Sequence, residues 1–223
     1  MQPYEPTLAA MKRHTDTRDD ATADEIWALE HPPVYTLGLA GRMEHVHSPD
    51  GIPVVKSDRG GQVTYHGPGQ LVVYTLLDLR RLGIPPRALV QRLEQAIIDL
   101  LRELGLGGDR RAGAPGIYLG DSKIAALGLR IRRGCSYHGL ALNVNMDLDP
   151  FQGIDPCGYR GLRVTQLADH GLPLECREVS ALLHPHLLSH LGGDAAAPRF
   201  SFSDMHAAPG RTPDCRQGSI LGG

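Results

Sequence analysis

Residues 58–71 read DRGGQVTYHGPGQL and combine several glycines and a proline with an arginine, a tyrosine and a histidine. Such a segment buries little apolar surface, so packing alone does not account for it. Glycine permits positive φ and the close approach of another group, which would bring Arg59, Tyr65 and His66 against a bound molecule. A glycine-rich hairpin that joins two strands is the alternative, and the segment alone does not separate the two interpretations.

Cys157 lies between Pro156 and Gly158, a setting that suits a reactive thiol. Proline restricts one φ and glycine frees the next, so the thiol can be presented on a sharp turn. Presented in this way, the thiol is a candidate nucleophile. A buried structural cysteine is the alternative.

Lys123 precedes the small-residue run Ile-Ala-Ala-Leu-Gly at 124–128, against which a ligand chain could lie. A cation beside a cysteine favours the thiolate, whose thiol otherwise has a pKa of about 8.5. Lys123 is therefore a candidate activator of a nucleophilic cysteine. A solvated charge at the start of a strand is the alternative.

Several histidines could have a functional or a structural role, and some could bind a metal ion. His66 and His138 stand in the chemically rich segments, where a hydrogen-bonded structural histidine is the alternative to a functional one. Two short clusters raise a metal hypothesis, but no cysteine or carboxylate partner sits at a matching ligand spacing, so no metal is predicted. These clusters are His45 with His47, and His184 with His186 and His190.

Composition restricts the class of protein. The chain has 223 residues, 41% of them hydrophobic, which fits a single globular domain with a sizeable core. Its net charge of −2 gives no general basic field for nucleic acid. No apolar run approaches the roughly 20 residues of a membrane span, and the first residues lack the pattern of a signal peptide.

The cysteines indicate the cellular compartment. Their spacing is wide and irregular and contains no CxxC pair, so neither a disulfide framework nor a zinc centre is predicted. Free thiols fit a cytoplasmic protein. The four positions are Cys135, Cys157, Cys176 and Cys215.

Helices are predicted where apolar residues recur every three or four positions. The clearest lies at 86–104, with Pro86 suited to its first turn and Gly105 to its end. We read its apolar stripe as core. Further helices are predicted at 4–13, 164–170 and 178–191.

Strands are predicted at 25–30, 34–38, 70–77, 116–119, 122–131 and 137–145. The run at 70–77 is nearly all apolar and rich in strand formers, which indicates a strand covered on both faces. Gly120 and Asp121 make a tight turn between two strands. The chain is thus a single α+β domain, with a mostly antiparallel or mixed sheet and packed helices over residues 1–192. Residues 193–223 are predicted to be a mobile C-terminal tail.

Four motifs in register resemble the octanoyltransferase family, also called lipoate-protein ligase B or lipoyl(octanoyl) transferase. They are RGGxxTYHGPGQL from Arg59, KIAAxG from Lys123, HGxALN from His138 and PCG at 156–158. The similarity runs from about residue 4 to about residue 167. It implies the biotin/lipoate ligase–transferase fold, which periodicity alone does not identify.

The resemblance also implies roles for individual residues. The cysteine of PCG, here Cys157, accepts the acyl group, and the lysine of KIAAxG, here Lys123, is its catalytic partner. No cofactor is implied. The residues implied to bind the acyl substrate are Arg59, Gly60, Gly61, Gln62, Val63, Thr64, Tyr65, His66, Ala126, Leu127, Gly128, Gly139, Leu140 and Ala141.

The implied reaction moves an octanoyl or lipoyl group from acyl carrier protein to a lysine of a lipoyl-accepting domain. The implied acceptors are the lipoyl domains of 2-oxoacid dehydrogenase complexes and the glycine cleavage H protein. No nucleic acid and no membrane take part. An ATP-dependent lipoate or biotin ligase of the same fold is one rival, although it would need no cysteine. A non-catalytic acyl-binding or lipoyl-domain-binding module is the other.

Overall fold

Helix α2 (Pro86–Glu103) follows directly from the apolar stripe in its sequence. In the structure, a computed structural model, Leu89, Leu93, Ile97 and Leu100 are completely buried. Pro86 occupies the first turn, where a missing backbone N–H leaves no hydrogen bond unmade. Over the described residues, neither α2 nor any other helix is long and apolar enough to cross a membrane.

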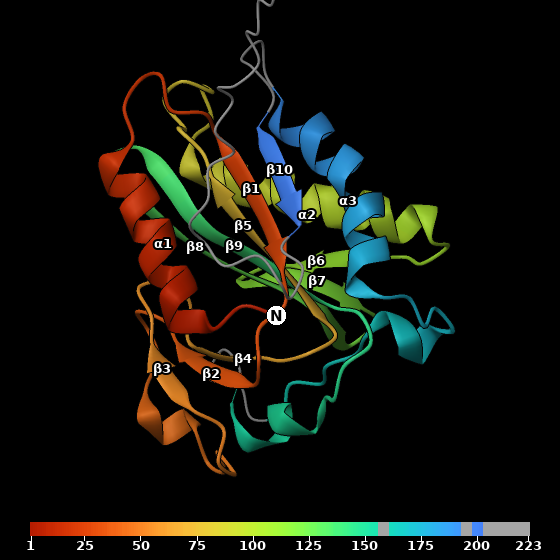
Figure 1. Ribbon diagram of the computed structural model, residues 1–223. Helices are drawn as coiled ribbons and strands as arrows, with labels where there is room; N and C mark the ends of the chain where they lie inside the picture. Colours follow the sequence, from red (N-terminus) through yellow and green to blue (C-terminus); the bar gives the residue numbers. More distant parts are fainter. Residues whose placement is uncertain (156–160, 193–197, 203–223) are drawn as a thin grey trace, which may run out of the picture.

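The structure describes residues 1–155, 161–192 and 198–202. Within these ranges seven strands form one sheet in the order β10-β1-β5-β9-β8-β7-β6 (Figure 1). Neighbouring strands are antiparallel except for β1 with β10, which confirms the predicted mixed, mostly antiparallel sheet. The strands are β1 (Glu25–Leu29), β5 (Gln70–Leu76), β6 (Asp109–Arg111), β7 (Ala114–Leu119), β8 (Ser122–Arg132), β9 (Cys135–Asn143) and β10 (Arg199–Phe202).

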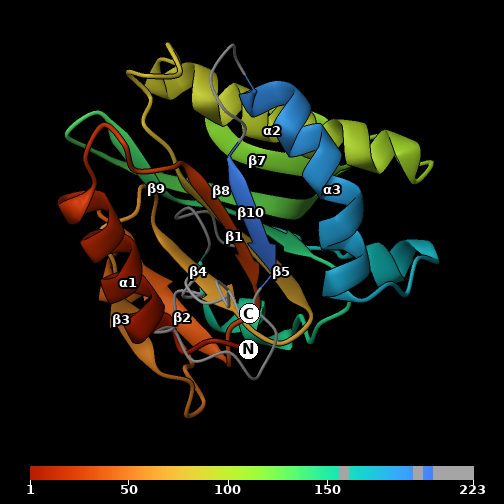
Figure 2. The same cartoon turned by 45° about the horizontal axis from the view of Figure 1, so that its top comes forward.

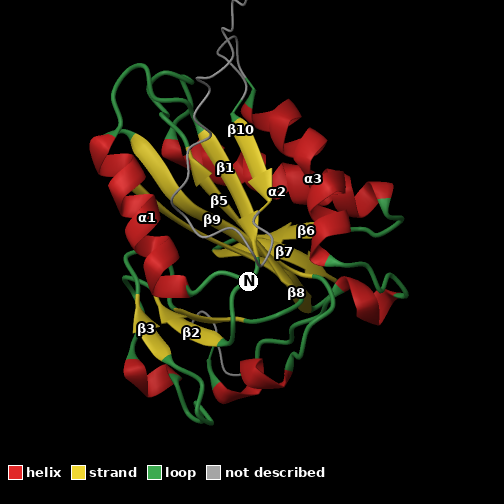
Figure 3. Cartoon of the chain, in the orientation of Figure 1, coloured by secondary structure: helices red, strands yellow, loops and turns green. Residues whose placement is uncertain are grey.

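A second, smaller sheet of three strands in the described ranges has the order β3-β2-β4 (Figure 3). It contains β2 (Val34–Leu37), β3 (Val54–Lys56) and β4 (Val63–His66). The extended run predicted at 34–38 therefore joins a different sheet from the run at 25–30. The turn that contains Pro32 and Pro33 separates the two runs, because proline has no backbone N–H to donate to a neighbouring strand.

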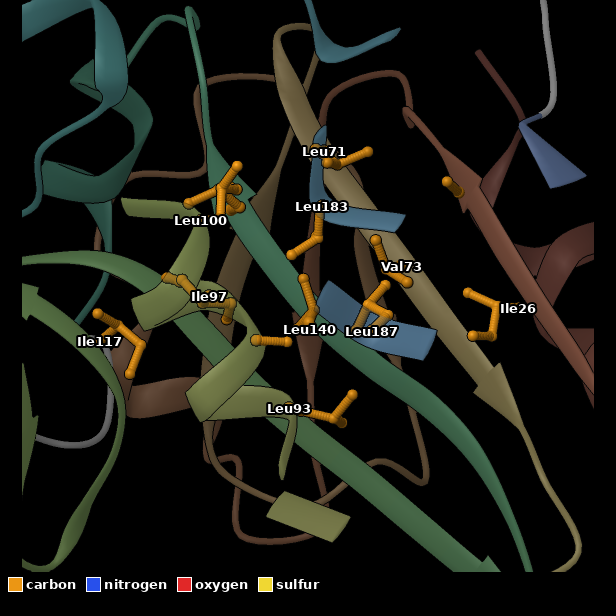
Figure 4. Packing of buried hydrophobic residues seen from close by; sticks show 14 of the residues in the cluster. Ile26, Leu71, Val73, Leu93, Ile97, Leu100, Ile117, Leu140, Leu183 and Leu187 are labelled. Carbon is orange, nitrogen blue, oxygen red and sulfur yellow. The ribbon is translucent and has the colours of Figure 1, made fainter. Parts of the chain in front are cut away.

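Helices cover both faces of the large sheet (Figure 2). Leu71 and Val73 of β5 pack in the cluster that includes α2 and α3 (Cys176–Leu191). Val72 and Tyr74, which alternate with Leu71 and Val73, pack with α1 (Tyr4–Thr17) on the opposite face, as alternation along a strand requires. Every residue of β5 is buried, so the prediction of a doubly covered strand is confirmed. Figure 4 shows Leu71, Val73 and Leu140 facing Leu183 and Leu187 in the larger core.

The helix predicted at 164–170 is wrong in its first part. Only Leu167–His170 is helical, as the short 3-10 helix η4. Val164 forms a parallel bridge to Lys123, and the Thr165 N–H donates to the Lys123 carbonyl at 3.0 Å. The backbone groups at the start of β8 thus provide long-range partners, which replace the local hydrogen bonds of a helix.

Part of the predicted C-terminal tail belongs to the sheet. Arg199–Phe202 forms β10, which pairs with β1 in parallel. The edge of β1 offers unpaired backbone groups that a short strand can satisfy. The prediction of a mobile tail is therefore wrong for these residues, and residues 193–197 and 203–223 lie outside the described ranges.

Candidate active site

A cavity of about 430 Å³ lies beside β8 and β9 and collects nearly all the residues predicted to bind an acyl group. Its walls come from the glycine-rich segment, from the middle of both strands and from the start of α1. The predicted residues that line it are Arg59, Gly60, Gly61, Gln62, Val63, Thr64, His66, Lys123, Ala126, Leu127, Gly128, Gly139, Leu140 and Ala141. The fold therefore brings three distant motifs together around one volume.

Strand β8 makes room for this cavity because it is longer than its neighbour. Its pairing with β7 ends at Ala125, which leaves the edge beyond that residue free of β7. The glycine-rich segment approaches this edge, and the Gly60 N–H donates to the Leu129 carbonyl at 2.9 Å. A Cβ at Gly128 would lie only 2.9 Å from the Gly60 carbonyl oxygen, so this approach requires glycine.

Arg59 organises the glycine-rich segment from within. Its guanidinium is buried and donates to the Thr36 carbonyl at 2.6 Å and to the Thr36 hydroxyl at 2.9 Å. It also donates to the carbonyls of Gly60 at 2.9 Å and Gln62 at 2.7 Å. These contacts tie the segment to β2. Arg59 thus shapes the cavity by holding its wall in place.

Tyr65, which the family resemblance assigns to acyl binding, is not among the residues that line the cavity. Its ring packs between Tyr35 and Phe151, each with a ring centroid 5.5 Å away. Thr64 and His66, on either side, both line the cavity. Successive residues of β4 point to opposite faces, so Tyr65 points away from the side that Thr64 and His66 share.

His66 starts a chain of hydrogen bonds that leads toward Lys123. Its Nδ1 lies 2.7 Å from Gln70 Oε1, and Gln70 Nε2 donates to Asn143 Oδ1 at 2.9 Å. Asn143 Nδ2 donates to the Thr165 carbonyl at 2.9 Å. Since Thr165 pairs with the backbone of Lys123, the chain links the glycine-rich segment to the start of β8. Sequence reasoning missed Gln70 and Asn143, although a polar residue at the first position of β5 and one at the last position of β9 were a usable signal.

Lys123 is buried at the edge of the cavity. Its Nζ donates to the Pro115 carbonyl at 3.1 Å and lies 5.3 Å from the centre of the Tyr118 ring. A register shift between β7 and β8 next to Lys123 re-aims side chains at this point. Gly116 has a φ of 132°, and a Cβ there would come within 3.1 Å of Lys123 Cε. The local backbone is therefore built around this lysine.

Cys157 lies outside the described residues, so the structure gives no contacts for it. Asp155, the last described residue before it, is anchored by its backbone N–H to the His45 carbonyl at 2.9 Å. Its carboxylate lies 2.8 Å from His47 Nε2. On the far side of the gap, Leu162 and Val164 line the cavity.

The cysteines that lie within the described residues, Cys135 and Cys176, are buried and unsuited to nucleophilic chemistry. Cys135 and Cys176 are free thiols, and burial raises the pKa of both. A raised pKa keeps a thiol protonated at neutral pH, and the protonated form is a poor nucleophile.

The histidine clusters that raised a metal hypothesis are held by carboxylates in separate places. His47 contacts Asp155, while His186 contacts Glu103 at 2.7 Å and His190 contacts Asp99 at 2.7 Å. Across the described ranges, no three His, Cys, Asp or Glu side chains are grouped so as to hold a metal ion.

Two buried histidines near the cavity make stability sensitive to acid. Burial lowers the pKa of His66 to about 3 and that of His31 to about 4. The unfolded chain takes up these protons near pH 6.5, well before the folded protein does, so stability falls as the pH drops below about 6.5.

We expect each of these two histidines to remove up to about 1.4 kcal/mol of unfolding free energy per pH unit in this window. Urea unfolding between about pH 7 and pH 5.5 measures the slope, above the range where most carboxylates titrate. A His31→Gln variant should have a shallower slope than the unmodified chain. Equal slopes would show that burial does not keep His31 neutral.

The chain is similar in sequence to a known protein family and to several of its relatives. Residues 3–187 match the family described as the lipoyl protein ligase A/B catalytic domain. The octanoyltransferase of Dechloromonas aromatica is 60% identical over 188 residues, which cover 84% of this chain and 92% of that protein. The octanoyltransferase of Xanthomonas campestris pv. campestris (strain B100) is 58% identical over 192 residues, covering 86% of this chain and 83% of that one.

Solved structures of lipoate ligases share the fold. Lipoate-protein ligase A bound with ATP superposes with a TM-score of 0.71 at 19% identity, covering 89% of this chain and 83% of that one. The bipartite lipoate protein ligase of Thermoplasma acidophilum gives a TM-score of 0.68 at 18% identity, covering 89% and 82%. At such identities the similarity demonstrates the predicted fold and nothing further.

Proposed function

Because the chain belongs to the lipoyl protein ligase A/B catalytic domain family and resembles its octanoyltransferases over most of its length, we propose a two-step octanoyl transfer through Cys157. The enzyme is an acyltransferase of protein lipoylation, and its acceptors are lipoyl-accepting proteins. Within this activity, the donor in our proposal is octanoyl-acyl carrier protein. The proposed acceptors are the lipoyl domains of 2-oxoacid dehydrogenase complexes and the glycine cleavage H protein. The free thiols Cys135 and Cys176 favour a cytoplasmic setting.

In the first step, the Cys157 thiolate attacks the carbonyl carbon of the donor thioester. A new carbon–sulfur bond forms to Cys157, and the bond to the carrier sulfur breaks. The departing carrier thiolate takes a proton from the Lys123 ammonium, which leaves a free carrier thiol and a neutral lysine. One thioester replaces another, so the step is close to balanced.

In the second step, the neutral ε-amine of the acceptor lysine attacks the acyl-cysteine. A carbon–nitrogen bond forms, the bond to Cys157 breaks, and the proton lost by the amine passes to Lys123. The thiolate and the ammonium are thereby restored for the next cycle. Conversion of a thioester to an amide is downhill, so the reaction needs no ATP.

The cavity carries this proposal, because it gathers the glycine-rich segment, Lys123 and the middle of β8 and β9 around one volume. Its size suits a small ligand, since ligand pockets have volumes of roughly 300–1,000 Å³. Leu162 and Val164 also line it, shortly after Cys157 in the sequence. A lysine that gives up a proton in the first step and takes one up in the second fits the position of Lys123 beside the cavity.

The direct test is transfer from purified octanoyl-acyl carrier protein to an unmodified lipoyl domain without ATP. Mass spectrometry should find one octanoyl group on the acceptor lysine, and none on an acceptor in which that lysine is replaced by arginine. Modification that occurs only with free octanoate and ATP would identify an adenylate-forming ligase. Binding of the acyl chain without any transfer would identify a non-catalytic module.

A further inference from the structure

Small side chains form the floor of the cavity on the α1 face of the large sheet. Ala126 of β8 lies opposite Ala141 of β9, and Gly128 lies opposite Gly139. Ala141 packs in the cluster around α1, whereas its neighbour Leu140 packs in the core under α2 and α3. An apolar chain can therefore lie along this face between the two strands and the glycine-rich segment.

His138 stands at one end of this floor because of an unusual backbone conformation. It lies opposite Leu129, and alternation along β9 would turn it toward the core on the α2 side. However, His138 has a φ of 61°, a left-handed value that is uncommon for residues other than glycine. Its ring instead stacks on Tyr137 at 5.0 Å and meets Tyr74 edge-on at 6.1 Å, both on the α1 face. Such strain clusters at functional sites.

The chemistry of the His138 ring follows from its partner. Nε2 lies 3.0 Å from Asp58 Oδ1, and the same carboxylate accepts a hydrogen bond from the Tyr137 hydroxyl at 2.6 Å and pairs with Lys12 at 3.3 Å. A carboxylate only accepts, so Nε2 carries the hydrogen and Nδ1 is left as an acceptor. Burial lowers the pKa of His138, which favours this neutral ring.

The Nδ1 atom is the unusual feature of this site. His138 is only 1% exposed and lines the cavity, and among the described residues Nδ1 has no hydrogen-bond partner. Buried polar atoms are nearly always paired, so such an atom indicates a ligand or water. His138 thus brings an unpaired hydrogen-bond acceptor to one end of a floor of small residues.

The distance along the strands places this acceptor where an acyl chain would end. Lys123 lies at the opposite end of β8 from Leu129, the residue paired with His138. The floor between Ala141 and His138 spans three strand positions, roughly 10 Å, and Lys123 lies three further β8 positions beyond Ala126, the partner of Ala141. An extended chain of eight carbons has a similar length, since its bonds of about 1.5 Å each advance in a zigzag.

We propose that His138 determines chain length by closing the acyl site with an unpaired hydrogen-bond acceptor. This inference rests on the proposed function, with the reacting carbonyl at the Lys123 end. A chain longer than octanoyl would press an apolar methyl group against the His138 ring and its unpaired Nδ1. A chain of the same greater length that ends in a hydroxyl would donate a hydrogen bond to Nδ1.

The test compares two donors of equal length, nonanoyl- and 8-hydroxyoctanoyl-acyl carrier protein, beside octanoyl. It measures kcat/KM for acylation of the unmodified enzyme and of His138→Gly, since glycine accepts a positive φ without strain. The hydroxyl-to-methyl preference of the unmodified enzyme should fall on the order of tenfold in His138→Gly. Use of nonanoyl relative to octanoyl should rise. The solvation of the hydroxyl is common to both enzymes and cancels in this comparison.

His184→Gln is the matched control, because His184 stacks on Phe200 away from the cavity residues. It should leave both ratios unchanged. If His138→Gly does not fold, His138→Asn retains a residue that tolerates positive φ. If these variants transfer acyl groups with an unaltered hydroxyl-to-methyl preference and an unaltered nonanoyl-to-octanoyl ratio, only the role of His138 is overturned. If the unmodified enzyme does not transfer octanoyl, the proposed function is overturned, and this inference with it.

Discussion

Replacing Cys157 with alanine should remove both the acyl-enzyme and the transfer reaction. Incubation of the unmodified chain with octanoyl-acyl carrier protein should add one hydroxylamine-sensitive octanoyl group to the peptide that contains Cys157. Without the thiol no thioester can form, so we expect Cys157→Ala to lower the rate by a factor on the order of 10⁴ or more. Intact-mass and peptide mass spectrometry measure the adduct, and acceptor modification measures the transfer.

Cys135→Ser serves as the control for this substitution. Cys135 is buried beside the Arg133–Gly134 turn, and burial raises the pKa of its thiol, so it should not carry the acyl group. The Cys135→Ser variant should retain the adduct on Cys157, even if its stability falls. An octanoyl label on Cys135, Cys176 or Cys215 would contradict the assignment.

Replacing Lys123 with methionine should leave the fold intact and slow transfer by a factor of about 10² or more, as expected when a general acid–base group is lost. Methionine keeps the length and the apolar stem but removes the charge beside the Tyr118 ring and the hydrogen bond to the Pro115 carbonyl. The same change should raise the pKa of the Cys157 thiol, because a neighbouring cation favours the thiolate. Alkylation by iodoacetamide as a function of pH measures this shift.

Lys56→Met is the matched control, since Lys56 is exposed at the end of β3. It should change neither the rate nor the alkylation profile. If Lys123→Met behaves like Lys56→Met in both measurements, Lys123 plays no part in activating the cysteine. A loss of activity together with a fall in melting temperature would instead assign Lys123 to the stability of the β7–β8 hairpin.

Much of the candidate site could be predicted because its chemistry is concentrated in short motifs. Arg59, Lys123 and Gly139 belong to three separate motifs, and each lines the same cavity in the folded chain. Their roles in the reaction stay predictions until the variants are measured. Tyr65 belongs to the same motif as Arg59, but its ring packs between those of Tyr35 and Phe151.

The sequence by itself determined the family, the reaction class and the main helix. A motif is recognised from neighbouring residues alone. The apolar residues of α2 recur with the helical period of 3.6 residues, so the sequence indicates which face of this helix is buried. The octanoyltransferase relatives and the family match confirm the family and the reaction class, and α2 confirms the helix.

Only the tertiary structure decided which distant backbones pair and which way individual side chains point. Arg199–Phe202 became a strand because β1 had a free edge, and Val164 left its predicted helix because Lys123 offered backbone partners. His138 faces the cavity because of the sign of one φ angle. Backbone pairing and backbone handedness depend on contacts between residues far apart in the chain, and no local pattern of residue types records them.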